Sequence, residues 1–267
     1  MIYLPARIPL LLLSATIGNA RQIAAWLSSL RVRPCTVVEE TRRPVPLFPL
    51  FLHPSGLLLP MTAPSRRGAP GAVHKKVSEF LGGNHRAAFR GNRLPPFGRI
   101  MEVLRKYDLL PAIFFLKSRA DCDQALDACR DNPAPDSGRK RRRRAAMDEF
   151  IRQSPRIASH RQLWHLEHLA VGAHHAGQLP SWKIVLERLM TDGLLDAVFA
   201  TTTVAAGVNF PARTIALLNS DRFNGTQFLP LDATEFHQVT GRAGRRGMDH
   251  IGFALAIPGR FMDIRHI

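Results

Sequence analysis

Three arginines near the end of the chain have the type and spacing for phosphate chemistry. The segment GRAGRRG begins at Gly241 and supplies Arg242, Arg245 and Arg246. Arg242 and Arg245 are three positions apart, so they share a face wherever the backbone is helical. Two guanidinium groups that converge on one point stabilise the charge that spreads over a phosphoryl group in its transition state. The spacing favours an arginine-finger site, and the open alternative is a loop of arginines paired with surface carboxylates.

The rest of a nucleotide site is missing from the sequence. No GxxxxGK[ST] phosphate loop occurs, and Gly-Lys never appears as a dipeptide. The pair Asp148 and Glu149 follows RRRRAAM instead of the apolar strand that would position a magnesium ligand. We therefore expect the chain to be incomplete for ATP hydrolysis alone.

Other classes of site find less support. No GxSxG elbow for a serine hydrolase is present. The histidines match neither HExxH nor a zinc finger, so we expect no metal, and His174 and His175 are interpreted as turn residues. Three cysteines without CxxC spacing predict no disulfide framework and indicate a reducing cytoplasm. Cys122 and Cys129 lie seven apart and are predicted to be core.

The net charge of +16 is concentrated in two strips. The segment 42–106 holds twelve Lys or Arg against two acidic residues, and the run RKRRRR at Arg139 to Arg144 supplies the remaining surplus. Pro-rich or turn-rich sequence surrounds both, so both are interpreted as linkers or surface insertions. A polyanionic partner, above all nucleic acid, is expected. The alternative for RKRRRR is a solvated loop without a partner.

Short apolar runs alternate with amphipathic segments along the chain. This pattern predicts an α/β fold, a parallel sheet with helices on both faces joined by right-handed crossovers. The strands are expected at 9–13, 36–38, 112–116, 169–172, 195–200, 215–218 and 252–257. The helices are expected at 20–30, 118–130, 180–193 and 234–242, with capping boxes at Asn19 with Gln22 and at Ser118 with Asp121.

Ligands of such folds gather at the carboxyl ends of the strands. Three polar, loop-prone segments are expected there: SATIGNA from Ser14, TTTVAAGVNFPA from Thr201, and GRAGRRG. No run approaches the ~20 apolar residues of a membrane span, so no membrane partner is expected.

Five ordered segments resemble motifs of one family. SATIGNA is similar to motif III, PAIFFLKSR (111–119) to motif IV, AHHAGQLP (173–180) to the block after it, ATTTVAAGVNFPAR (200–213) to motif V, and QVTGRAGRRG (238–247) to motif VI. The chain thus resembles the C-terminal part of a superfamily 2 DExH-box helicase core, in the superkiller-like branch and nearest its bacterial members. The resemblance covers about residues 4–47 and 101–260.

The resemblance implies roles for residues in these segments. Arg242 and Arg245 would be catalytic fingers that reach the γ-phosphate of ATP on the preceding domain. The residues on the nucleotide side would be Gln238, Gly207, Asn209 and Arg246. Those that hold the backbone of one RNA or DNA strand would be Thr201, Thr203, Ser118 and Arg119. Ser14 and Thr16 would couple hydrolysis to strand separation.

The same resemblance implies a division of the chain. Residues 1–47 would be the end of a first RecA-like motor domain, 48–100 a Pro/Arg-rich linker, and 101–267 a second RecA-like domain with an insertion at 131–160. The family's motifs I and II would lie upstream of Met1, so ATP and Mg²⁺ would be shared with a complementary N-terminal motor domain.

Two alternatives to a motor role stay open. The chain would be a basic nucleic-acid-binding module without catalysis, or a nonfunctional remnant with its strand at 10–13 left uncovered.

Overall fold

The structure is a computed structural model, which describes residues 4–5, 7–14, 17–63, 71–83, 95–131, 137–201, 210, 212–223, 226–259 and 262–263. Its centre is a seven-stranded sheet in the order β2-β1-β9-β6-β3-β5-β4. The strands are β1 (Leu47–Leu52), β2 (Leu58–Pro60), β3 (Ala112–Leu116), β4 (Val171–His174), β5 (Ala197–Thr201), β6 (Thr214–Leu217) and β9 (Gly252–Ala256). All neighbouring pairs are parallel except β1 with β2. The predicted α/β, RecA-like class is confirmed.

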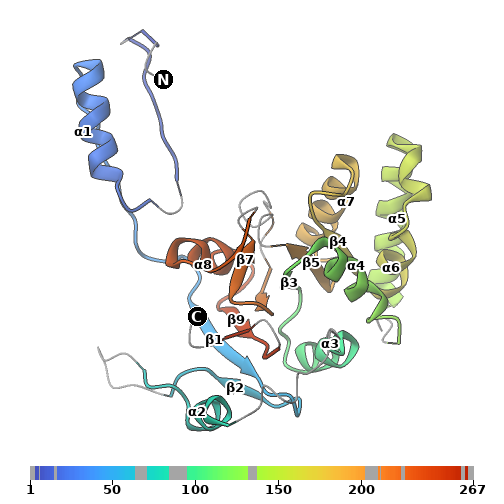
Figure 1. The fold of residues 1–267 in the computed structure, drawn as a ribbon. Helices are drawn as coiled ribbons and strands as arrows, with labels where there is room; N and C mark the ends of the chain where they lie inside the picture. The colour runs from blue at the N-terminus through green and yellow to red at the C-terminus, as the bar shows by residue number, and fades with distance from the viewer. Residues whose placement is uncertain are drawn as a thin grey trace.

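Helices cover both faces of the sheet (Figure 1). Side chains alternate along a strand, so Phe114 of β3 joins one core, while Ile113 and Phe115 join the other. The first core includes α3 (Phe97–Lys106) and α4 (Arg119–Asp127). The second includes α5 (Ser137–Gln153), α7 (Pro180–Thr191) and α8 (Ala233–Thr240). None of the described helices has the length and apolarity to cross a bilayer.

Smaller elements complete the described fold. They are α1 (Ala20–Arg31), α2 (Lys75–Gly82), the short helix η2 (Pro155–Ser159), α6 (Leu163–Leu169), and a hairpin of β7 (Asp221–Phe223) and β8 (Phe228–Pro230). The hairpin was not expected from the sequence. Cys122 and Cys129 lie in the core as predicted, and burial raises the pKa of both thiols, that of Cys129 to about 12.

The segment before β1 differs from the prediction. Helix α1 is confirmed, but the expected strands at 9–13 and 36–38 are wrong: both stretches lie outside the described sheets, and Leu11 and Leu13 are 83% and 85% exposed. Asn19 precedes α1 without a side-chain capping bond. An apolar run becomes a strand only where a neighbour supplies its ladder of hydrogen bonds. Figure 1 shows α1 and this segment standing apart from the sheet.

The stretch 48–100, predicted as a linker, supplies structure to the sheet. It contains most of β1, all of β2 and α2, and the start of α3. Proline runs usually interrupt strands, and this misled the prediction. Pro49 nevertheless sits inside β1, opposite Ala254 of β9, and its carbonyl accepts a hydrogen bond from Met61 N at 3.0 Å.

The basic run RKRRRR is a helix and not a loop, and part of it is core. Arg143 in α5 is 1% exposed and donates to Leu194 O at 3.0 Å and Glu167 O at 2.7 Å. Arg139, one turn earlier, donates to the buried Asp196 Oδ1 at 2.6 Å. With Met147 these side chains form an inward stripe at helical spacing. Periodicity could not reveal the stripe, because all residues of the run are cations.

Replacing Arg143 by Met should destabilise the protein by about 2–4 kcal/mol, because the buried carbonyl of Leu194 and the partly buried carbonyl of Glu167 lose a charged donor. Arg141→Met, on an exposed position of the same helix, should change stability by less than ~0.5 kcal/mol. Urea unfolding of the two variants measures the difference. Equal stabilities would show that Arg143 does not anchor α5.

Candidate nucleotide and nucleic-acid site

The segment GRAGRRG lies at the edge where the parallel strands begin. It connects the end of α8 to the start of β9, and Gly252 N donates to Pro46 O at 2.8 Å, directly before β1. The prediction that it lies at the carboxyl ends is wrong. A helix that follows a parallel strand runs back across the sheet, so a segment at the end of that helix returns to the opposite edge.

Asp249 fixes the orientation of Arg245. Its carboxylate accepts hydrogen bonds from Arg245 Nε at 2.8 Å and Nη2 at 2.9 Å, and from the Arg245 backbone amide at 2.8 Å. Arg213, directly before β6, adds a bond from Nε at 2.8 Å. Burial would raise the pKa of Asp249, but these donors outweigh it and lower the pKa to about 2. The expected alternative, an arginine paired with a carboxylate, therefore holds for Arg245, although the carboxylate is buried.

The pairing leaves one edge of the Arg245 guanidinium available. Among the described residues Nη1 has no hydrogen-bond partner, and the residue is 8% exposed. A bidentate carboxylate on the Nε side holds the other edge in a fixed direction. Arg245 is therefore oriented, and its Nη1 edge can still donate to an oxygen of a ligand.

Gln238 lies in the last turn of α8, and Arg242 follows two residues after the helix ends at Thr240. Both are half-buried, and the backbone of Arg242 is held by its amide, which donates to Val239 O at 3.2 Å, and by its carbonyl, which accepts from Ala212 N at 3.0 Å. Asp232 begins the helix with a capping box to Glu235. The cap and these backbone bonds fix the position of Arg242 in the turn after α8.

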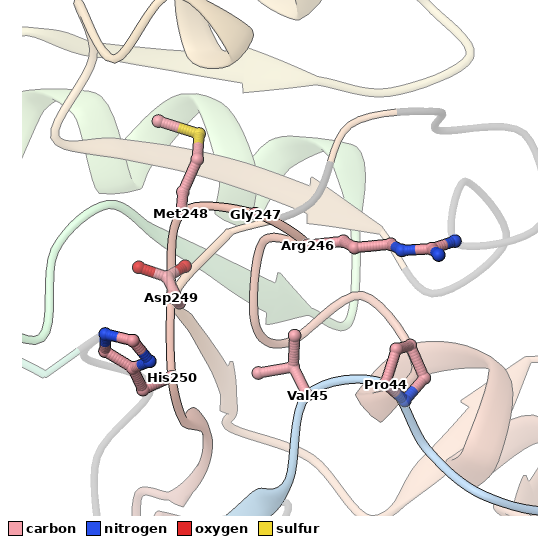
Figure 2. Close-up of a pocket in the computed structure, with 7 residues that line it drawn as sticks. All are labelled: Pro44, Val45, Arg246, Gly247, Met248, Asp249 and His250. Atoms are coloured by element: carbon pink, nitrogen blue, oxygen red, sulfur yellow. The ribbon is translucent and has the colours of Figure 1, made fainter.

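Arg246 is exposed beside a hollow of about 450 Å³. The hollow is lined by Pro44, Val45, Arg246, Gly247, Met248, Asp249 and His250 (Figure 2). In Figure 2 the guanidinium of Arg246 points away from Val45 and Asp249. The hollow thus lies between residues 246–250, which follow the arginines, and Pro44 and Val45, which precede β1.

Arg43 fastens the segment before β1 to the arginine loop. Its Nη2 donates to Thr240 O at 3.0 Å and to Ala243 O at 2.6 Å, one carbonyl on each side of Arg242. Burial lowers the pKa of the Arg43 guanidinium. Next to it, Val45 packs on Gly244, which has φ +83° and where a Cβ would lie 2.5 Å from Val45 Cγ1. In the sequence Arg43 contributes only to the basic charge of the segment 42–106, and no motif singles it out.

Three of the four residues expected to hold a nucleic-acid strand lie at the opposite edge of the sheet. Leu116 at the end of β3 pairs with Thr201 at the end of β5. Ser118 and Arg119 follow β3, so they and Thr201 lie at the carboxyl ends of two neighbouring strands. Ser118 Oγ accepts the Asp121 amide at 3.1 Å and so caps α4, while Arg119 is exposed. The structure brings these three together and keeps them at the edge away from Arg242.

Four of the expected site residues lie outside the described residues: Thr16, Thr203, Gly207 and Asn209. Ser14 is described and exposed, in the segment before α1.

The two histidines predicted to lie in a turn are buried. His174 ends β4, and His175 Nδ1 accepts the Gly177 amide at 3.2 Å while its Nε2 lies 3.3 Å from Asp123 Oδ1. Burial lowers the pKa of His174. A Cβ on Gly177 would lie 3.7 Å from Arg119 Cδ, so this block packs beside Arg119. No group of His, Cys, Asp or Glu within the described ranges is arranged to hold a metal ion.

The ion pairs of Asp249 make stability depend on pH. A carboxylate whose pKa falls from 3.8 to about 2 on folding contributes stability that is present above pH ~4 and is lost as the pH falls through about 2. Asp249→Asn should therefore lower the free energy of unfolding at pH 7 by roughly 2 kcal/mol and reduce its loss on acidification. Denaturant titrations from pH 7 to pH 2 measure both. Parallel pH profiles for the variant and the wild type would contradict the assignment.

Loss of Arg43 should loosen the arginine loop. In Arg43→Met the carbonyls of Thr240 and Ala243 lose the hydrogen bonds from Arg43, and we expect amide hydrogen exchange at Ala243 and Gly244 to speed up by about tenfold. Arg42→Met, on the exposed neighbour, removes the same charge and should leave exchange unchanged. Equal exchange in the two variants would show that Arg43 does not hold the loop.

Comparison with known proteins identifies the family. The chain is 36% identical to the probable helicase HelY of Mycobacterium tuberculosis over 280 residues, which cover 96% of the chain and 31% of that protein. It is 31% identical to the exosome RNA helicase MTR4 of Homo sapiens, over 96% of the chain and 26% of the relative. No family model matches. The chain spans about a third or less of the relatives it matches, and it belongs to the superfamily 2 DExH-box helicases.

Proposed function

We propose that this chain is the second motor domain of an ATP-dependent helicase and supplies its arginine fingers. One observation carries the proposal: Asp249 orients Arg245 on the same loop whose backbone fixes Arg242. A finger acts best when it is oriented before the charge develops, because reorganisation then costs little during the reaction. The relatives, described as helicases, support the assignment of the activity.

ATP and Mg²⁺ would be held mainly by a first motor domain, since this chain has no phosphate loop. Arg242 and Arg245 would enter the nucleotide site from outside and reach the γ-phosphate. Gln238 and Arg246 flank them on α8 and on the following loop, where they would contact the nucleotide; Gly207 and Asn209 would lie at the same interface.

One strand of RNA or DNA would lie along the other edge of the sheet. Arg119 is exposed there, Ser118 follows β3, and Thr201 ends the neighbouring strand β5. Hydroxyl groups and an arginine at this place suit phosphate contacts, which position a strand without reading its sequence. Thr203 would join them, and Ser14 and Thr16 would couple the two sites. Closure of two domains around ATP and reopening after hydrolysis would move the strand.

We also propose that the domain boundary lies near residue 47. β1 begins at Leu47 and belongs to the sheet, so the residues before it would be the end of the first RecA-like domain. The second domain would then include β1 and β2 in addition to 101–267.

The free cysteines Cys35, Cys122 and Cys129 support a cytoplasmic location.

Reconstitution tests the finger assignment. The chain is combined, by fusion or in trans, with a DExH motor segment that carries GxxxxGK[ST], and RNA-stimulated ATP turnover is measured. Arg242→Ala and Arg245→Ala should each lower turnover by ~10³-fold, because a finger stabilises the transition-state charge. The matched control is Arg188→Ala, which removes an exposed arginine on α7.

The outcome separates the two functions considered. Turnover unchanged in both finger variants would reject the fingers. Nucleic-acid binding without ATP turnover in the reconstituted wild type would favour a non-catalytic binding module.

A further inference from the structure

The six cations of the run RKRRRR in α5 divide into two groups with different surroundings. Arg139 and Arg143 point into the protein and are engaged by Asp196 and by buried carbonyl oxygens. The remaining four of the run are exposed, and among the described residues none of their side chains forms a hydrogen bond or ion pair. They are Lys140, Arg141, Arg142 and Arg144. Packing of the helix therefore accounts for two of its six consecutive cations and leaves four unexplained.

These four cations repel one another on the folded protein. Lys140 and Arg144 are four positions apart, and Arg141 and Arg144 three, so their side chains are neighbours on the helix surface. They also lie in the first half of α5, which has no acidic residue in its first turn, and the positive end of the helix dipole disfavours cations there. A bound polyanion relieves both kinds of repulsion.

The acidic residues of the same helix do not neutralise this group. Glu149 is engaged by Arg152 and Gln153, three and four positions later, in the second half of α5. Asp148 lies four positions after Arg144, but within the described part of the chain the two side chains form no ion pair. The pKa of Glu149 is accordingly lowered, chiefly by the hydrogen bond from Arg152. The positive charge of the first half therefore remains open to an external ligand.

The helix presents these side chains from a fixed platform. Asp196 is bound on one side by Arg105 of α3 at 3.0 Å and on the other by Arg139 at 2.6 Å. Arg143 ties the next turn to α6 through Glu167 O. Because successive residues turn by 100° along a helix, Arg141 and Arg144 leave the side opposite this anchor. A rigid helix lowers the ordering cost of binding, which is then confined to the side chains.

The chemistry of this face selects a phosphate backbone. Guanidinium groups bind phosphate in a bidentate manner, and Lys140 adds a point charge. The only aromatic residue of α5, Phe150, packs against the core and gives bases nothing on which to stack. Contacts with phosphate alone carry no sequence information.

We propose that the outward face of α5, formed by Lys140, Arg141, Arg142 and Arg144, is an auxiliary nucleic-acid site outside the motor cleft. It binds the phosphate backbone of RNA or DNA without sequence preference and tethers the protein to its strand. The site does not include Arg242 or Arg245, so an experiment on it tests this proposal independently of the finger assignment.

Salt-dependent binding tests the site. Fluorescence anisotropy with a labelled 20-nucleotide RNA and a 20-base-pair DNA is measured for the chain at several salt concentrations. Lys140→Ala/Arg141→Ala/Arg144→Ala should weaken binding by at least about tenfold. It should also reduce the slope of log K against log [salt] by about 2–3, because each lost phosphate contact removes ~0.7–0.9.

The matched control loses the same charge elsewhere. Arg130→Ala/Arg152→Ala/Arg188→Ala removes three exposed arginines that each have a carboxylate partner, and it should keep the wild-type slope. Thermal unfolding by circular dichroism verifies that both triple variants are folded. Equal slopes in the α5 variant and the wild type overturn the proposal, as does an equal loss in the control. Displacement of RNA by polyglutamate of matched charge would also overturn it, in favour of an acidic protein partner.

Discussion

The buried carboxylate of Asp249 holds the candidate nucleotide-facing edge together. It accepts three hydrogen bonds from Arg245 and one from Arg213. Arg213 precedes β6 and also donates to Asp108 O, in the turn before β3. One buried ion-pair cluster therefore ties the loop after α8 to the starts of two central strands. Such a cluster is costly to break, because removing one partner leaves a buried charge uncompensated.

The arginine loop is held from a second side by the residues that precede β1. Arg43 bonds carbonyls on both sides of Arg242, and Val45 fills the space over Gly244. A displacement of the segment before β1 would thus shift the arginine loop directly, because the hydrogen bonds of Arg43 join the two. The proposed strand-binding residues lie at the other edge of the same, mostly parallel sheet, and its strands separate the two groups. This arrangement suits a domain that moves as one body between a nucleotide and a nucleic-acid strand.

The sequence predicted the elements that carry their own pattern. Strands β3, β5, β6 and β9 are continuous apolar runs, and α7 has apolar residues at helical spacing, so these were found within a few residues. The strand predicted at 9–13 was wrong because an apolar run joins a sheet only where a neighbouring strand pairs with it, and the composition of the run does not show whether such a neighbour exists. β1 was missed because Pro49 is an unusual strand residue.

The site was predicted as a set of residues but not as a geometry. Motif spacing placed Arg242 and Arg245 on one loop, but it did not identify Asp249 or Arg43. Both act through side-chain hydrogen bonds that only the folded structure shows. The edge of the sheet was also misplaced, because chain order alone does not show where a crossover helix ends. In α5 the alternation of buried and exposed positions was hidden, because every residue of RKRRRR is a cation.

The central claim is that Arg242 and Arg245 contact a triphosphate held by another motor domain. A structure of the reconstituted protein with ADP and aluminium fluoride, a mimic of the transferring phosphoryl group, tests it directly. The account predicts the guanidinium groups of both residues within ~3 Å of fluoride, with Asp249 still bound to the Nε side of Arg245. Fluoride surrounded only by groups of the other domain, with both arginines directed elsewhere, would contradict it.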